Sequence, residues 1–203
     1  MADRTSSGRR FVLPPAVSHA SGENISRSAR VFLDTEFTDL TPDARLISLG
    51  AVSADGQEFY AELADGWVPQ FCSEFVRQTV VPLLELPSSA RLTQAQCATH
   101  FVRWLEGIGA GFPFVVVTVD SCIDWWMLGL LIDGEGWTPG QSEVSVGWSE
   151  AQLSLRVQLA HWSHADTMAR FRHALEDSLK GLRRHHALDD ARALRRAWSS
   201  ICK

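Results

Sequence analysis

The order of hydrophobic segments predicts a mixed α/β sheet, antiparallel at one side and parallel at the other. Three β-type segments follow one another between residues 30 and 63, and the last two are joined by Asp55 and Gly56, a strong hairpin signal. Helical segments then alternate with a further β-branched run toward the C-terminus. This order of elements indicates a fold class but no function.

Each element has its own local signal. The predicted strands are residues 30–37, 45–53, 57–63 and the buried run 113–120. The predicted helices are residues 73–86 ending near Pro82, 92–109 with Thr93 as N-cap, 121–134 closed by Gly134 or Gly136, 163–182 and 185–203. Residues 134–150 are rich in Gly, Trp and Ser and predict a loop, whereas 153–160 fit either a strand or a helix.

Composition bounds the class of protein. The chain has 203 residues, of which 45% are hydrophobic and 21% charged, and its net charge is −5. These values are ordinary for one globular domain and exclude wholesale disorder, a collagen-like repeat and a coiled coil. The four cysteines form no CxxC pair, which favours reduced thiols in a cytoplasmic protein. Without an apolar run of ~18 residues or a signal peptide, no membrane association is expected.

The first 29 residues differ from the rest of the chain. They are rich in Ser, Arg, Gly and Ala, and we expect residues 1–29 to form a disordered N-terminal arm, with one folded domain over 30–203. The arm carries an excess of positive charge, so contact with a polyanion is one interpretation, and a solvated tail is the favoured one.

Carboxylates gather at three points that carry the functional argument. Asp34 and Glu36 alternate on the first strand and so project from the same face. Asp124 lies in the apolar helix 121–134, where an acid is costly without a partner. Asp120, four residues earlier, shares that helix face or caps the helix. Two acids held close together repel unless a cation lies between them, and oxygen ligands suit Mg²⁺ or Mn²⁺.

The third point precedes the last helix. Two histidines, His185 and His186, are followed by two acids, Asp189 and Asp190. A single acid in the first turn of a helix is unremarkable, because the helix dipole favours it. Two histidines before two acids are less common, although surface histidines among basic neighbours remain the alternative.

Taken together and in this order, DTEF, then SxxDW after the central strand, then HxALxDA near the C-terminus resemble the DEDDh 3′-5′ exonuclease superfamily. This is the DnaQ-like, RNase T-like branch of the ribonuclease H-like fold. The segments LISLGAV, DGQEFYAEL and FVRQTVVPLL look similar to the compact bacterial 3′-5′ exoribonuclease group. The resemblance covers roughly residues 30–200 and implies a mixed five-stranded sheet flanked by helices.

The resemblance also implies roles. It makes the metal ligands Asp34, Glu36, Asp124 and Asp190, which would hold two divalent metal ions, Mg²⁺ or Mn²⁺. His185 would be the general base, because five positions separate it from Asp190 as in the motif. His186 is the alternative one position along. The residue before Asp124, often Tyr in the family, is Ile123 here, a departure that leaves the metal site intact.

Substrate contacts are expected on both sides of these acids. Phe37 follows the DTE strand and would stack on a terminal base of the substrate. A place for Phe37 in the hydrophobic core is the equal alternative. Thr35 is a second candidate for substrate binding. Arg192 and Arg195 recur at helical spacing and suggest a phosphate-binding stripe, with a solvated helix face as the alternative.

The sequence therefore predicts a metal-dependent exonuclease that removes nucleoside 5′-monophosphates from RNA or DNA 3′ ends, with RNA favoured. A DNA 3′-5′ exonuclease for proofreading or trimming is the first alternative. A non-catalytic nucleic-acid-binding module on the same fold is the second, and a hydrolase of small oligonucleotides or nucleotides is the third. The resemblance allows a homodimer, but no residue demands one.

Overall fold

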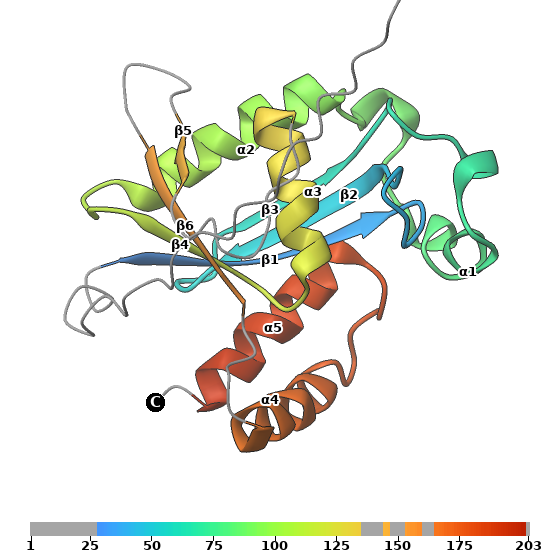
Figure 1. Ribbon diagram of the computed structural model, residues 1–203. Coiled ribbons are helices and arrows are strands. Elements are labelled where there is room, and N and C mark those ends of the chain that lie inside the picture. Colours follow the sequence, from blue (N-terminus) through green and yellow to red (C-terminus); the bar gives the residue numbers. More distant parts are fainter. Residues whose placement is uncertain (1–27, 135–143, 147–152, 160–164, 202–203) are drawn as a thin grey trace, which may run out of the picture.

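A single sheet organises the protein (Figure 1). The computed structural model describes residues 28–134, 144–146, 153–159 and 165–201. Its strands are β1 Ala29–Phe37, β2 Leu46–Ser53, β3 Glu58–Glu62, β4 Val115–Val119, β5 Val144–Val146 and β6 Leu153–Leu159. They lie in the order β3-β2-β1-β4-β6-β5. The expected N-terminal arm lies outside the described residues except for its last two, and β1 already begins at Ala29.

Strand directions confirm the mixed α/β prediction. β1, β2 and β3 form an antiparallel meander, whereas β1 pairs in parallel with β4 and β4 with β6. The predicted count of five strands is wrong, because β6 and β5 extend the four strands β3-β2-β1-β4 to six. β5 lies inside the predicted loop 134–150. It has only three residues and pairs antiparallel at the sheet edge, too short for alternation to reveal it.

Helices cover both faces of the sheet, with α2 and α3 on one face and α4 and α5 on the other (Figure 1). The α-helices are α1 Glu74–Thr79, α2 Gln94–Gly109, α3 Cys122–Asp133, α4 Ala165–Ser178 and α5 Ala187–Ile201. Short 3₁₀ turns span η2 Pro69–Phe71, η3 Val81–Leu83 and η4 Ser88–Ala90. Within the described parts of the chain, none of the helices combines the length and apolar character needed to cross a membrane.

Local signals fix where these elements begin and end. Thr93 caps α2 as predicted: its hydroxyl accepts from the Gln96 N–H and the Gln96 side chain accepts from the Thr93 N–H. Gly134 ends α3 in the left-handed conformation, with φ 73°. Gly56 turns the β2–β3 hairpin with φ 98°, a value that favours glycine.

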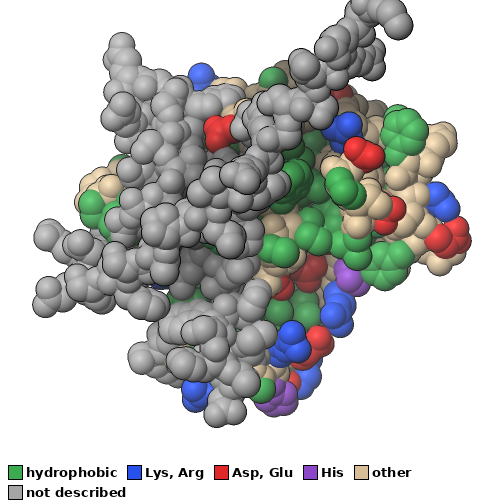
Figure 2. Space-filling view, viewed as in Figure 1, with side chains coloured by type: hydrophobic (Ala, Val, Ile, Leu, Met, Phe, Trp, Pro, Cys, Tyr) green, Lys and Arg blue, Asp and Glu red, His purple; other side chains and the backbone are tan. Residues whose placement is uncertain are grey.

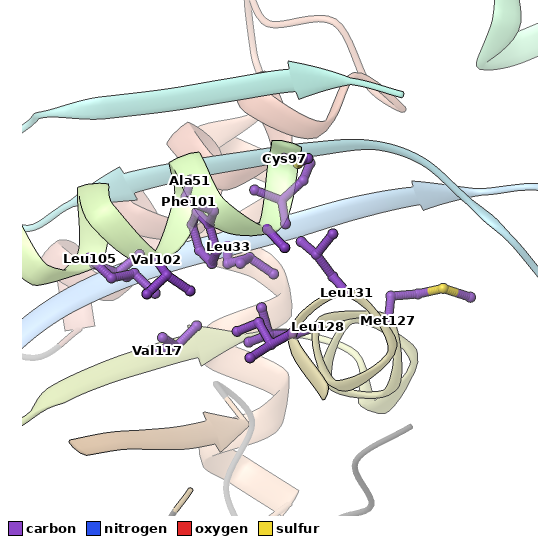
Figure 3. Packing of buried hydrophobic residues seen from close by; sticks show 14 of the residues in the cluster. Leu33, Ala51, Cys97, Phe101, Val102, Leu105, Val117, Met127, Leu128 and Leu131 are labelled. Atoms are coloured by element: carbon purple, nitrogen blue, oxygen red, sulfur yellow. The ribbon is translucent and has the colours of Figure 1, made fainter. Parts of the chain in front are cut away.

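Two hydrophobic layers hold the helices to the sheet. The larger lies between the sheet and the helices α2 and α3, where Leu33, Phe101 and Leu128 are fully buried (Figure 3). The smaller joins α4 and α5 to the other face through Phe32, Phe171 and other apolar side chains. Burial on both faces explains why β1 and β4 read as nearly continuous apolar runs.

A glycine lets α5 approach the sheet. Gly50, opposite Asp34 on β2, lies against the first turn of α5, and a Cβ at this position would come within 2.2 Å of the Leu188 backbone nitrogen. No side chain larger than hydrogen fits there without displacing the helix. Gly50 therefore sets how closely the N-terminus of α5, which carries Asp190, approaches the end of β1.

Candidate active site

A cleft of about 530 Å³ opens where β1 and β4 end. Figure 2 shows acidic side chains gathered in a hollow bordered by hydrophobic ones, with a histidine beside them. Asp34 and Glu36 reach it from β1, because alternate residues of a strand point to one face. The other charged lining residues come from the β1–β2 loop, the β4–α3 junction, α4, the α4–α5 turn and α5.

Asp124 of α3 is held at the cleft by Thr35 of β1. It lies in the first turn of α3 with 2% of its surface exposed. Its Oδ1 atom accepts two hydrogen bonds from Thr35, at 2.6 Å from the hydroxyl and 3.0 Å from the backbone N–H. Thr35 lines the cleft, and its hydroxyl and backbone N–H both bind Asp124 and orient it.

The loop before α5 brings His185 and Asp190 to the same cleft. The His185 N–H donates to Asp190 Oδ2 at 2.8 Å, which closes the turn onto the helix. His185 is the described non-glycine residue with positive φ, at 66°, a conformation that costs energy for a residue with a Cβ. Its ring meets Phe75 edge-on at 5.0 Å between centroids. The strained turn is therefore closed by a hydrogen bond and packed against an aromatic ring.

His186, the next residue, points away from this cleft. Only 2% of its surface is exposed, and its ring stacks on Tyr60 at 4.8 Å. Its Nε2 atom lies 3.2 Å from Glu85 Oε1. The structure thus separates the two histidines and leaves His185 as the one that lines the cleft.

Asp189 belongs to the same buried side as His186. It accepts from Arg183 Nε at 2.7 Å and from Arg192 Nη1 at 2.6 Å. Arg183 also binds Glu85, at 2.9 Å. We call Glu85, Arg183, His186, Asp189 and Arg192 the clasp.

The cleft carboxylates resist ionisation. Burial, together with repulsion from Asp190 and Asp124, raises the pKa of Glu36 to about 8. Burial and repulsion from Asp120 raise the pKa of Asp124 to about 8, although the Thr35 hydrogen bonds oppose this. Burial likewise raises the pKa of Asp190 to about 6 and that of Asp34 well above its ordinary value. Cations placed among these groups would reverse the shifts.

The donor set fits divalent metal ions. Ligand atoms of Asp34, Asp120 and Asp124 lie within 4.8 Å of one another, as do those of Glu36, His185 and Asp190. Carboxylate oxygens are the ligands that Mg²⁺ and Mn²⁺ prefer. The described lining of the cleft holds seven acids and one arginine, so acidic side chains predominate in it.

The predicted substrate residues fall into two places. Thr35 and Phe37 line the cleft, and Phe37 also packs against the main core, so both of its expected surroundings are present. Arg192 and Arg195 are absent from the described cleft lining. Arg192 binds Glu58 and Asp189, and Arg195 donates to the Ala54 carbonyl, all on the side of the β2–β3 hairpin.

Several lining residues were not predicted as site residues, among them Asp39, Phe75 of α1 and Glu176 of α4, because none of them belongs to a motif. Asp120 had two interpretations, a cap of the helix or a residue on the same face as Asp124. The cap is wrong, because the N-cap of α3 is Ser121, whose hydroxyl accepts from the Ile123 N–H; Asp120 lines the cleft near Asp124. The spacing of four between Asp120 and Asp124 was the signal available for it.

Comparison with known proteins gives partial likenesses. No family model matches the chain. Two proteins of Mycobacterium tuberculosis, strains CDC 1551 / Oshkosh and ATCC 25618 / H37Rv, are named 3′-5′ exoribonuclease, and each is 40% identical to this chain over 60 residues. That match spans 30% of this chain and 35% of each relative, about a third of their length.

A solved structure is similar in fold. The crystal structure of cell-death related nuclease 4 matches with a TM-score of 0.51 at 12% identity, over 86% of this chain and 64% of that chain. At this identity the match speaks for the fold alone.

Proposed function

We propose that this protein is a metal-dependent 3′-5′ exonuclease of the DEDDh type. The observation that carries the proposal is the meeting of Asp34, Glu36, Asp124 and Asp190 with His185 in one cleft, from three segments far apart in the sequence. The names of the partial relatives and the fold of the solved nuclease support the same reaction class.

The four acids would hold two divalent cations. When bound, such cations supply Lewis-acid stabilisation of the attacking and leaving oxygens of a phosphodiester. Asp124 is oriented for this by the two Thr35 hydrogen bonds, and Asp190 is tied to the His185 backbone. The ligand set would thus be linked to the strand end on one side and to the histidine turn on the other.

His185 would accept the proton of the attacking water at a ring nitrogen. A ring nitrogen lies within 4.8 Å of carboxylate oxygens of Glu36 and Asp190. Burial and the neighbouring Arg184 lower the pKa of His185, which keeps the ring neutral and ready to accept a proton near pH 7. The turn that carries His185 lies outside the helices and strands, and the His185 ring packs against Phe75.

RNA is the proposed substrate class, with DNA as the alternative. The preference rests on the two exoribonuclease names and on the segments that resemble the compact bacterial group. A non-catalytic binding module is less favoured, because such a module would have no need for buried carboxylates that repel one another.

The test uses a duplex with a 3′ overhang, labelled at the 5′ end, as RNA and as DNA. Each is incubated with Mg²⁺, Mn²⁺ or EDTA. We expect a ladder that shortens from the 3′ end, requires the cation and is faster on RNA. Release of nucleoside 5′-monophosphate, identified by chromatography, establishes the cleaved bond.

Two acid-to-amide variants make the test specific. Asp34→Asn should abolish the ladder while circular dichroism stays native. Asp43→Asn, an equal change on an exposed residue of the β1–β2 loop, should retain it. Full activity of Asp34→Asn would refute the metal site, and binding without any cleavage by the unmodified protein would favour the binding module.

A further inference from the structure

The cleft presents an electrostatic problem for its proposed substrate. Among its described lining residues, seven are acids: Asp34, Glu36, Asp39, Asp120, Asp124, Glu176 and Asp190. Cations at the floor would neutralise the buried members. The rest of a nucleic acid strand carries one negative charge per nucleotide and must leave the cleft past Asp39 and Glu176. Fixed positive side chains along that path are therefore needed.

Arg184 is the cation that the cleft lining provides. It immediately precedes His185, and its side chain is 60% exposed. Its partner is Glu176 of α4, with Nη2 at 3.5 Å from Oε1 and the glutamate 61% exposed. An exposed ion pair of this kind is weak, so a phosphate can replace the carboxylate at low cost.

Other arginines of the same region are already engaged. Arg183 binds two carboxylates at 2.7 and 2.9 Å, and Arg192 binds two at 2.6 and 2.7 Å. Each of these two guanidinium groups is held by several charge-assisted hydrogen bonds. Arg184, with one long and exposed contact, is the better candidate for a ligand phosphate.

The cleft continues along α4. A second hollow of about 290 Å³ shares Asp120, Leu175 and Glu176 with the cleft and adds Arg172. Arg172 is exposed and lies four residues before Glu176, hence on the same face of the helix. A nucleic acid strand that leaves the cleft through this hollow meets Arg184 first, passes Glu176 and reaches Arg172.

We propose that Arg184 and Arg172 bind the sugar-phosphate backbone on the 5′ side of the scissile bond, and that Glu176 occupies Arg184 when no substrate is present. The inference rests on the proposed function, because only a strand held by its 3′ end leaves the cleft in the 5′ direction. It identifies the preferred substrate as an oligonucleotide of several residues, not a single phosphodiester. Glu176 then acts as a competitor of the substrate phosphate.

The test compares two substrates in the full-length protein with Mg²⁺ at pH 8, where the His185 ring is neutral with or without the Arg184 charge. One is a single-stranded decaribonucleotide, and the other is the dinucleotide ApA, which has no phosphate beyond the scissile one. Arg184→Gln should lower kcat/KM for the decamer about tenfold, through KM, and for ApA less than twofold. It should also make the logarithmic salt dependence shallower by about 0.7, the slope of one lost phosphate contact on a single strand.

Two further variants and a control sharpen the result. Glu176→Gln should raise kcat/KM for the decamer about threefold, since Arg184 loses its competitor, and Arg172→Gln should lower it about threefold. Arg103→Gln removes the same charge from an exposed position on α2, across the sheet, and should change neither substrate. Thermal melting verifies that each variant is folded.

The outcomes separate this inference from the proposed function. If the unmodified protein cleaves neither substrate, the proposed function fails. If it cleaves the decamer but Arg184→Gln behaves like Arg103→Gln, the proposed binding of the substrate backbone by Arg184 and Arg172 is wrong, whereas the proposed exonuclease function is retained. An equal loss on both substrates, or a lower decamer rate in Glu176→Gln, overturns the path as well.

Discussion

His185 with Asp190, and His186 with Asp189, are neighbouring pairs of the same residue types in opposite environments. In the first pair the carboxylate faces other acids, and its pKa rises to about 6. In the second, burial opposes ionisation, but hydrogen bonds from Arg183 and Arg192 lower the pKa of Asp189 below its ordinary value. The first turn of α5 therefore separates a cleft rich in acids from the clasp, in which acids are paired with basic side chains.

Buried acids therefore have two different roles in the clasp and in the cleft. In the clasp each acid has a basic partner, so its charges hold the α5 N-terminus against the segment around Glu85. In the cleft, seven acids share the described lining with one arginine, Arg184 at the rim. Uncompensated acids destabilise a fold, and their presence at one point indicates a ligand that neutralises them.

The largest expected contrast is between Asp190→Asn and Asp189→Asn. Asp190→Asn should lower kcat on RNA by about 10³-fold or more, because it removes one of the four acids proposed to hold the cations. In EDTA it should raise the melting temperature by a few degrees, since it relieves repulsion. Asp189→Asn should do the opposite: a loss of about 2 kcal/mol in the free energy of unfolding, with activity within about fivefold at a permissive temperature.

Activity assays and thermal melts of both variants, with and without Mg²⁺, measure this contrast. Should Asp189→Asn lose activity as severely as Asp190→Asn while remaining folded, the division into cleft and clasp is incorrect.

A second, smaller effect is expected where β2 meets α5. Gly50→Ala places a Cβ within 2.4 Å of the Ala187 and Leu188 backbone, which forces the N-terminus of α5 outward. We expect a loss of about 2–3 kcal/mol in stability. Both cleft and clasp depend on this helix turn, so activity should fall about 100-fold even in the folded fraction.

The matched control is Gly107→Ala in α2, where a Cβ meets nothing within 4 Å. It should stabilise the protein by up to about 1 kcal/mol, because alanine favours a helix, and leave activity unchanged. Equal stability of the two variants by chemical denaturation would show that α5 adapts to the added methyl group.

The placement of several cleft residues could be predicted from the sequence. Alternation places Asp34 and Glu36 on one side of β1, and the apolar surroundings of Asp124 required a partner, which proved to be Thr35. The N-cap Thr93 of α2 and the terminal Gly134 of α3 could also be predicted from the sequence. The sequence also favoured His185 over His186 as the general base. His185 lines the cleft and His186 is absent from its described lining, but the role itself stays a prediction.

What escaped prediction depends on contacts between distant segments. The clasp joins Glu85 to residues about 100 positions away, and no local pattern encodes such a pairing. The role of Gly50 follows from the approach of α5, not from a turn signal. β5 was missed because a three-residue edge strand has no period. Of the two interpretations of Asp120, the helix cap is wrong, because Ser121 is the N-cap of α3.

A third prediction concerns pH. The folded-state pKa values of Glu36 and Asp124, about 8, lie above the unfolded values of 4.5 and 3.8. The folded protein therefore binds more protons between about pH 4 and pH 8, and the stability from these groups is lost as pH rises through that window. In EDTA the melting temperature should fall on the order of 5 °C between pH 5 and pH 8. Mg²⁺ should restore it most at pH 8.

The Asp190→Asn variant serves as the control for this titration. With one acid removed, repulsion among the others weakens, so the fall with pH should be smaller than in the unmodified protein. A melting temperature that rises with pH in EDTA, or a Mg²⁺ effect that is largest at pH 5, would contradict the assignment of these groups.

The smallest expected effect concerns the two arginines that the sequence predicted to bind phosphate. Arg192 cross-links Glu58 and Asp189, and Arg195 holds the Ala54 carbonyl of the hairpin. If these contacts are their main role, Arg192→Gln with Arg195→Gln should lower stability by about 1 kcal/mol and change decamer kcat/KM less than twofold. If they bind phosphate instead, the salt dependence becomes shallower, as expected for Arg184→Gln. Salt titration of the double variant beside Arg184→Gln thus decides whether the substrate backbone follows α4 or the outer face of α5.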